Sequence, residues 1–205
     1  MITTISQPIT LDEFWDWYPD GFGRYELHDG AIFEMQAIGN HEEVISFIMM
    51  ELVVQIKQLG LSYLIPKQAL IKPLDTNKSA YNPDVLILDK SSLNDEPLWK
   101  TRSTITQGKT VPLVIEVVST NWGYDYGHKL VDYEALGIAE YWIVDYLGLG
   151  GKRYIGDPKQ PTISIYQLVD EEYQVQQFRS NDLLISSIFT DLNLTAQQIF
   201  DVVNL

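Results

Sequence analysis

The chain lacks several features that mark common protein classes, and each absence excludes one of them. None of its 205 residues is cysteine, which excludes disulfide bonds, thiol catalysis and zinc ribbons. No apolar run approaches the roughly 18 residues of a transmembrane helix, so no membrane partner is predicted. The opening segment MITTISQPIT has neither a basic start nor an apolar core, so we expect no secretory signal and a cytoplasmic protein.

Positive charge is also scarce. The chain has 14 Lys and Arg against 28 Asp and Glu, a net charge of −14. A protein that coats nucleic acid non-specifically would be basic, because neutralised phosphates supply most of that affinity. The bases are unevenly spread, however: residues 67–109 hold seven of the 14, whereas residues 1–51 hold ten acids and Arg24 alone. Any phosphate contact is therefore expected at local sites, while the acidic surface keeps the protein in solution.

What the chain does contain is enough for a packed core. Hydrophobic residues make up 45% of the sequence, and neither a repeat nor a Ser/Gly linker divides it. We therefore predict one domain over 1–205, of the α/β or α+β class, with helices beside a mixed sheet. The predicted elements are a capped N-terminal helix from residue 11, a hairpin around Asp29-Gly30, a helix over 40–60 buried on two sides, strands at 62–74, 84–89, 112–119 and 139–146, a polar loop or lid at 89–111, a helix at 125–136, a C-terminal meander of strands at 162–168, 172–178 and 182–186, and a last helix at 195–203.

Two carboxylates stand where apolar strands are predicted. Asp84 follows Pro83 at the start of one strand, and Glu116 shares the side-chain parity of Val114 and Val118 in the most apolar strand. A buried carboxylate is costly unless it is paired, protonated or bound to a metal. Two acids on neighbouring strands would suit Mg²⁺ or Mn²⁺, although for either acid alone a salt bridge or a raised pKa is the more ordinary explanation.

Lys129 adds a cation to this pattern. In the helix after Glu116, the residues Tyr126, Lys129 and Tyr133 fall on one face, and that face is the apolar one. The side chain would either reach solvent along the tyrosines or lie beside the acidic residues. In the second case its charge would stabilise a phosphate during hydrolysis.

At this point the sequence resembles a known family. Pro83-Asp84 followed by Glu116 in IEVVS is similar to the PD-(D/E)xK nuclease superfamily, and the wider pattern resembles its Uma2-type branch of restriction endonuclease-like proteins, which is abundant in cyanobacteria. The residues that carry the resemblance are Tyr25-Glu26-Leu27, Asp29-Gly30, His41, Asp84, the segment 116–119, Asp125, Lys129, Tyr133, Gly137 and the EYWIVD segment 140–145.

The resemblance implies a restriction endonuclease-like fold and a set of site residues. Asp84 and Glu116 would hold the metal, Lys129 would stabilise charge, Glu26 would be a further acid, and His41 would position phosphate or water. The superfamily's usual lysine position is Val118 here, so Lys129 would be the same function moved to the next helix. The chain also has Thr120-Asn121-Trp122 where a Ser-Pro pair is usual, and Tyr146 where Pro is usual, which alters loop shape.

Three functions remain compatible with this reading. The first is a Mg²⁺- or Mn²⁺-dependent endonuclease that hydrolyses phosphodiester bonds of DNA. The second is a catalytically inactive module that keeps the nuclease fold and binds protein partners. The third is a hydrolase of another phosphoester, which a small closed pocket would favour. A homodimer would give a nuclease two centres for the two strands of a duplex.

Overall fold

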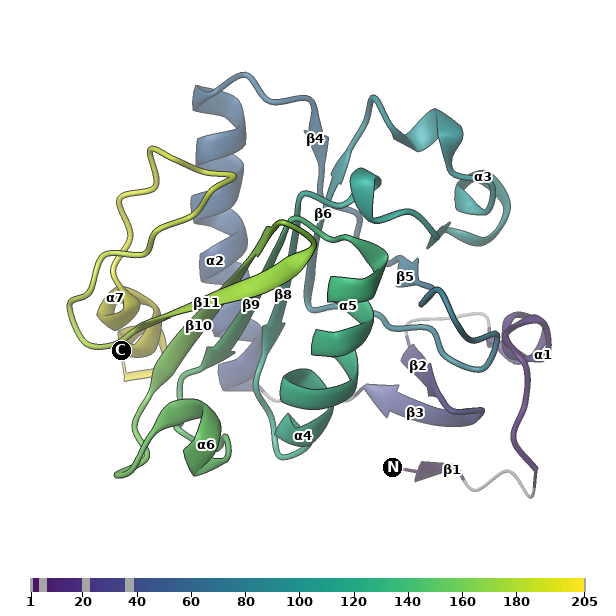
Figure 1. Ribbon diagram of the computed structural model, residues 1–205, viewed down its shortest axis with the longest axis horizontal. Coiled ribbons are helices and arrows are strands. Elements are labelled where there is room, and N and C mark those ends of the chain that lie inside the picture. The colour runs from purple at the N-terminus through teal and green to yellow at the C-terminus, as the bar shows by residue number, and fades with distance from the viewer. Residues whose placement is uncertain (1, 4–6, 20–22, 36–38, 205) are drawn as a thin grey trace.

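A mixed six-stranded sheet organises the computed structural model, which describes residues 2–3, 7–19, 23–35 and 39–204 (Figure 1). The strand order is β11-β10-β9-β8-β6-β4, in which β8 and β9 run parallel and the other neighbours antiparallel. The predicted mixed sheet is thereby confirmed. The strands are β4 (Tyr63–Leu64), β6 (Val85–Asp89), β8 (Leu113–Val117), β9 (Glu140–Asp145), β10 (Thr162–Val169) and β11 (Glu172–Phe178).

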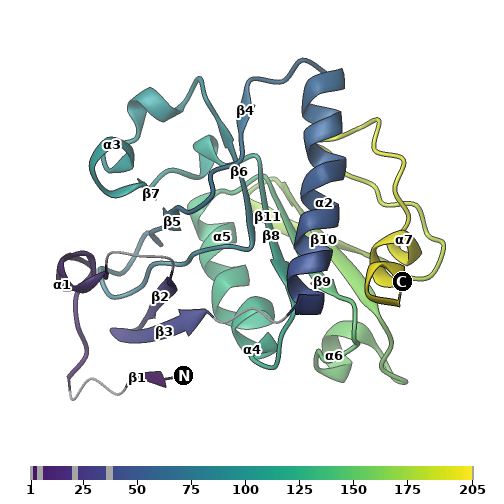
Figure 2. The same ribbon diagram turned by 180° about the vertical axis from the view of Figure 1, so that it is seen from behind.

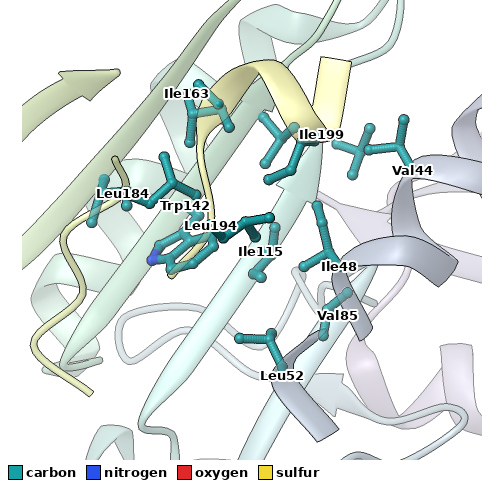
Figure 3. Close-up of a cluster of buried hydrophobic side chains, with 14 of the residues drawn as sticks. Val44, Ile48, Leu52, Val85, Ile115, Trp142, Ile163, Leu184, Leu194 and Ile199 are labelled. Carbon is teal, nitrogen blue, oxygen red and sulfur yellow. The ribbon is translucent and has the colours of Figure 1, made fainter. Parts of the chain in front are cut away.

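One face of the sheet is covered by α2 (Gly39–Gln58) together with the C-terminal segment and α7 (Ala196–Phe200) (Figures 1 and 2). Apolar residues of α2 recur every three or four positions, which places them on one side of the helix. Figure 3 shows this stripe directed toward apolar side chains of the central strands. The buried cluster formed in this way includes Val44, Ile48 and Leu52 from α2, Val85, Ile115 and Trp142 from the sheet, and Leu184, Leu194 and Ile199 from the C-terminal segment.

The opposite face is covered by the crossover from β8 to β9. Parallel neighbours need such a crossover, and here it comprises α4 (Trp122–Tyr124), a π-helical turn (Asp125–Lys129) and α5 (Leu130–Leu136). Gly137 ends α5 with a φ of 82°, the left-handed conformation that glycine adopts at low cost. Figure 2 shows α5 and α2 on opposite sides of the sheet. A short helix, α6 (Lys152–Ile155), follows β9.

The N-terminal region forms a separate small sheet beside the crossover. It contains α1 (Leu11–Trp17), capped by Thr10 and Glu13 as predicted, and a sheet of order β1-β3-β2. The hairpin turns at Asp29-Gly30, as its sequence indicated. A backbone bridge from Leu27 to Ala80 ties the hairpin to the segment before β6. The strands are β1 (Ile2–Thr3), β2 (Arg24–His28) and β3 (Ala31–Met35).

Several predicted elements are wrong. The proposed strand over 62–74 is two short strands in different sheets, β4 and β5 (Leu70–Ile71), because Pro66 interrupts the ladder. Residues 89–111 are not only loop: α3 (Trp99–Arg102) and β7 (Thr104–Ile105) form there, and β7 pairs with β5. Residues 182–186 form a single bridge, Leu183 with Thr195, in place of a strand.

Two helices also differ from their predictions. Val53 and Val54 of α2 are exposed, so this helix is buried on one side only. The helix expected over 125–136 begins with the π-helical turn, which the apolar spacing alone does not distinguish from an α-turn. Within the described ranges, no helix combines the length and apolar character needed to cross a membrane.

Candidate active site

Asp84 and Glu116 lie at one end of the neighbouring strands β6 and β8. Val85 pairs with Ile115 in the antiparallel ladder, so one further step brings Asp84 opposite Glu116. Both side chains are buried, with exposed fractions of 4% for Asp84 and 2% for Glu116. Alternation along β8 places Glu116 on the sheet face covered by α5, together with Val114. The two acids predicted from the strand pattern are therefore neighbours in space.

The Asp84 carboxylate is held by three groups. Its Oδ2 accepts a hydrogen bond from the Val117 amide at 2.9 Å and lies 3.4 Å from His41 Nε2. Arg24 Nη1 lies 3.6 Å from its Oδ1. His41 Nε2 also donates to the Val117 carbonyl oxygen at 2.7 Å, which fixes the proton on that nitrogen. Burial lowers the pKa of His41, but Asp84 and the Val117 carbonyl outweigh it, so the net shift is upward.

Lys129 lies at the centre of an acidic cluster. Its Nζ is 3.0 Å from Glu26 Oε1, 3.0 Å from Glu116 Oε1 and 3.5 Å from Asp125 Oδ1. The side chain is only 3% exposed, so the ammonium does not reach bulk solvent along the tyrosines. Burial disfavours its charge, yet the surrounding carboxylates raise the pKa of Lys129 well above its usual value. The ammonium stays charged at neutral pH.

The π-helical turn explains how the crossover supplies two of these groups. A π-turn is wider than an α-turn, and such turns occur frequently at functional sites. Here it buries Asp125, Tyr126 and Lys129 together on the side that faces the sheet. The turn thus contributes an acid and a base, four residues apart in the same element, to one cluster.

Glu26 reaches the cluster from the N-terminal hairpin. Its Oε1 accepts a hydrogen bond from the Asn82 amide at 2.8 Å, and its Oε2 lies 2.7 Å from His28 Nε2. Burial raises the pKa of Glu26, but Lys129, His28 and the Asn82 amide together lower it to about 2. Glu26 is therefore the permanently ionised partner of Lys129.

Glu116 and Asp125 are shifted in the opposite direction. Burial raises the pKa of Glu116 to about 8 and that of Asp125 to about 7. Lys129 partly offsets this effect, while the neighbouring Asp84 and Glu26 add repulsion to both. A carboxylate pair that repels in this way would gain from a further cation.

Four other residues belong to the site and were not predicted as part of it. Arg24 Nη2 donates to the carbonyl oxygens of Asn82 at 3.0 Å and Pro83 at 2.8 Å, which fixes the segment that leads into Asp84. Tyr133 donates its hydroxyl hydrogen to Glu116 Oε1 at 3.1 Å. Arg24 had one sequence signal, because it is the single base among residues 1–51. No periodic pattern is broken at Asn82, Tyr133 or His28, so the sequence gives no comparable signal for them. Tyr133 does share the predicted inward face of Lys129.

The donor chemistry fits a hard divalent cation. Asp84 and Glu116 offer carboxylate oxygens, which Mg²⁺ and Mn²⁺ prefer. Within the described residues, no group of three or more His, Asp or Glu forms a ready-made cage for a metal ion. Mg²⁺ commonly binds through one or two carboxylates and takes its remaining ligands from water and phosphate. Two carboxylates at a strand end therefore suit an ion shared with a phosphate-containing substrate.

The central mixed sheet flanked by helices is the α/β architecture expected for a restriction endonuclease-like protein. The chain belongs to the Uma2 family, described as "Putative restriction endonuclease", whose pattern matches residues 11–197. The family resemblance seen in the sequence is confirmed.

A solved structure supports the fold independently. The chain is similar to the crystal structure of "a putative nuclease belonging to DUF820 from Anabaena variabilis ATCC 29413", with a TM-score of 0.69 and 16% sequence identity. The similarity covers 96% of this chain and 99% of the other, so the whole architecture is shared. No curated protein matches the chain.

Proposed function

We propose that this protein is a metal-dependent nuclease that hydrolyses phosphodiester bonds of DNA. The observation that carries the proposal is the buried contact between Lys129 and Glu116, at 3.0 Å. This contact lies beside Asp84, at the neighbouring ends of two central strands. Membership of the Uma2 family supports a nuclease reaction. DNA as the substrate and Mg²⁺ or Mn²⁺ as the ion are our own assignments.

Asp84 and Glu116 would hold the ion. When bound, a divalent cation polarises a phosphate oxygen and favours the hydroxide form of a bound water. Lys129 keeps its proton, because the carboxylates around it hold its pKa well above the ordinary value. It is therefore unsuited to act as a general base, and its role is to stabilise negative charge as the P–O bond breaks.

Glu26 and His41 act through other residues. Glu26 holds the Lys129 ammonium in place from the hairpin side, at 3.0 Å. His41 donates a hydrogen bond to the Val117 carbonyl oxygen and lies beside Asp84, so it orients a carboxylate that would hold the ion. Both are positioning residues, because neither touches the reacting phosphate in this assignment.

Charge balance favours an additional cation during catalysis. Four buried acids, Glu26, Asp84, Glu116 and Asp125, are opposed by Lys129 and Arg24. Once Glu116 and Asp125 lose their protons, the four acids carry an excess of negative charge that repels a phosphodiester, so substrate binding at this position requires a metal ion to reverse the local potential. The proposed nuclease should therefore be inactive toward DNA when a chelator is present.

Cleavage assays on plasmid and single-stranded DNA test the proposal. We expect cutting with Mg²⁺ or Mn²⁺, none with EDTA, and a loss of about 100-fold or more in Asp84→Asn and Glu116→Gln. Asp95→Asn is the matched control, because Asp95 is an exposed acid paired with Lys109 at 3.4 Å. Cutting that survives in either site variant, or in EDTA, would contradict the assignment.

The inactive module remains the second candidate, and one observation favours it. Lys129 already neutralises two carboxylates at 3.0 Å, so the cluster is a satisfied ion-pair network without any metal. A metal that binds the folded state raises the melting temperature by mass action. A rise with Mn²⁺ in the wild type, absent in Glu116→Gln, supports the nuclease; no rise in either supports the module.

A further inference from the structure

A shallow, open hollow lies on the crossover, next in the chain to the segment that carries Asp125 and Lys129. It has a volume of about 370 Å³ and follows the end of β8, the strand that carries Glu116. Its walls come from α4 and its flanking residues, so it is contiguous in the chain with Asp125 and Lys129. The lining residues are Thr120, Asn121, Trp122, Gly123, Tyr124 and His128.

A chain of direct contacts connects this hollow with the cluster. The Tyr124 ring centre lies 4.6 Å from that of His28. His28 Nε2 lies 2.7 Å from Glu26 Oε2, and Glu26 Oε1 lies 3.0 Å from Lys129 Nζ. A group bound against Tyr124 is thus connected to Lys129 through the side chains of Tyr124, His28 and Glu26.

The lining chemistry suits a flat heterocycle. Trp122, Tyr124 and His128 are rings that remain partly or fully exposed, and the Tyr124 and His128 ring centres lie 5.5 Å apart. Thr120 and Asn121 add hydroxyl and amide groups at the rim, which can bond the polar edge of a base. The space around Gly123 is open, because a Cβ added there would meet no described atom within 4 Å.

The charge of the chain also favours stacking over phosphate binding. With a net charge of −14, the protein cannot hold a nucleic acid by general electrostatic attraction. Stacking of a base on an aromatic ring needs no positive surface and tolerates any base. Lys159 Nζ, 6.0 Å from the Trp122 ring centre, is one cation close to the hollow.

We infer that the hollow binds an unpaired nucleobase of the strand that is cut, next to the scissile phosphate. The inference rests on the proposed nuclease function and adds its substrate class: single-stranded DNA, or duplex DNA with a frayed, flapped or flipped base. Within an intact duplex both faces of a base are already stacked, so a ring in the protein gains a partner only when the base leaves the helix.

Binding to three matched oligonucleotides tests the inference. The probes are fluorescein-labelled strands of about 12 nucleotides: a thymidine strand, its duplex with a complementary strand, and an abasic strand with the same phosphates. Fluorescence anisotropy is measured in Ca²⁺ in place of Mg²⁺, to limit cleavage. We expect the wild type to bind the thymidine strand about tenfold more tightly than the abasic strand, and more tightly than the duplex.

Variants at Trp122 separate stacking from loss of folding. Trp122 contacts Tyr126 and Tyr154, so its removal could loosen the crossover. Trp122→Ala should weaken binding of the thymidine strand about tenfold and leave the abasic strand unchanged, whereas Trp122→Phe keeps a ring and should retain most of the affinity. Trp17→Ala is the matched control, since Trp17 is an exposed tryptophan on α1.

The outcomes distinguish this inference from the proposed function. Equal affinity for the thymidine and abasic strands, tighter binding of the duplex, or an equal loss on both strands in Trp122→Ala would overturn the base site. If the wild type cuts DNA in a manner that depends on Asp84 while showing any of these results, the nuclease stands and the base site falls. Absence of both cutting and binding would overturn both.

Discussion

At the scale of single residues, the charge of Lys129 decides whether the cluster can exist. Its ammonium is in contact with Glu26 and Glu116 at 3.0 Å in a buried setting. Removing one partner of a buried ion pair is far more costly than forming the pair is favourable, because the remaining charge has no water to solvate it. Lys129 is therefore required both for the proposed chemistry and for folding.

Lys129→Met provides a direct measure of this requirement. We expect the free energy of unfolding to fall by about 3–5 kcal/mol, because the ionised Glu26 carboxylate would be left buried without its cation. Lys109→Met is the control, since the exposed Lys109–Asp95 pair should contribute less than about 1 kcal/mol. Urea unfolding at pH 7.5 measures both. A loss in Lys129→Met no larger than in the control would show that the carboxylates are neutralised by another route.

The sequence predicts some of these residues and not others, for a physical reason. Glu116 and Lys129 each interrupt an apolar periodic pattern, and a charge that breaks such a pattern demands a partner. Arg24 lies in a segment without strong periodicity, and the pairing of Leu27 with Ala80 brings that segment beside Asn82 and Asp84. Contacts between segments so distant in the chain leave no trace in local spacing.

At the scale of elements, the crossover between β8 and β9 has open space at its first turn and close backbone packing at its end. Gly127 lies in the π-helical turn, and a Cβ added there meets no described atom within 4 Å. Gly108 instead supports the end of α5, where a Cβ would lie 2.1 Å from the Leu136 carbonyl oxygen and 2.6 Å from the Gly137 carbonyl carbon. A side chain would therefore fit at Gly127, whereas the close packing at Gly108 requires glycine.

Alanine at these two positions should have opposite effects on stability. Gly127→Ala is expected to raise the free energy of unfolding by about 0.4–1 kcal/mol, because alanine loses less backbone entropy on folding. Gly108→Ala should lower it by about 1–3 kcal/mol, since backbone atoms must move to admit the methyl group. Chemical denaturation of both variants is the measurement. Equal destabilisation by both would contradict the open geometry of the π-helical turn.

Elements with strong periodicity were predictable, and short ones were not. The strands β8 and β9 and the helix α2 follow from long apolar patterns, because burial on one or both faces dictates residue type. The strands β5 and β7 have two residues each, and they form a two-stranded sheet with one further bridge from Ile71 to Tyr81. The π-helical turn escaped prediction because α- and π-periods place the same residues inward over one turn.

At the scale of the whole molecule, the titration of the site acids determines how stability depends on pH. The folded chain keeps Glu116 and Asp125 protonated up to about pH 8 and 7, above their ordinary pKa values of 4.5 and 3.8. Between these limits the folded state binds more protons than the unfolded state, so stability falls as pH rises. The raised pKa of His41 acts in the same direction, because its charged form is stabilising and is lost at higher pH.

We expect the melting temperature of the metal-free protein to decrease between pH 5.5 and 8.5. The free energy of unfolding should fall by about 1.4 kcal/mol per pH unit for each excess proton that the folded state binds. Glu26, with a pKa of about 2, gives the opposite slope only below its ordinary value of 4.5 and does not act in this window. Differential scanning fluorimetry across this range measures the trend.

Two comparisons assign this trend to the site. Mn²⁺ favours deprotonated carboxylates, so it should flatten the decrease. Glu116→Gln removes one of the titrating groups and should flatten it without metal. A melting temperature that rises across the window in the wild type would be inconsistent with raised pKa values at Glu116 and Asp125.

The order of synthesis gives the crossover a final consequence. Glu26, Asp84 and Glu116 all leave the ribosome before Lys129, the cation that allows them to be buried together. Until the segment after β8 docks, the three acids stay hydrated and apart, and the nascent chain holds no assembled centre. Maturation of the site is thus tied to completion of the parallel β8–β9 pair.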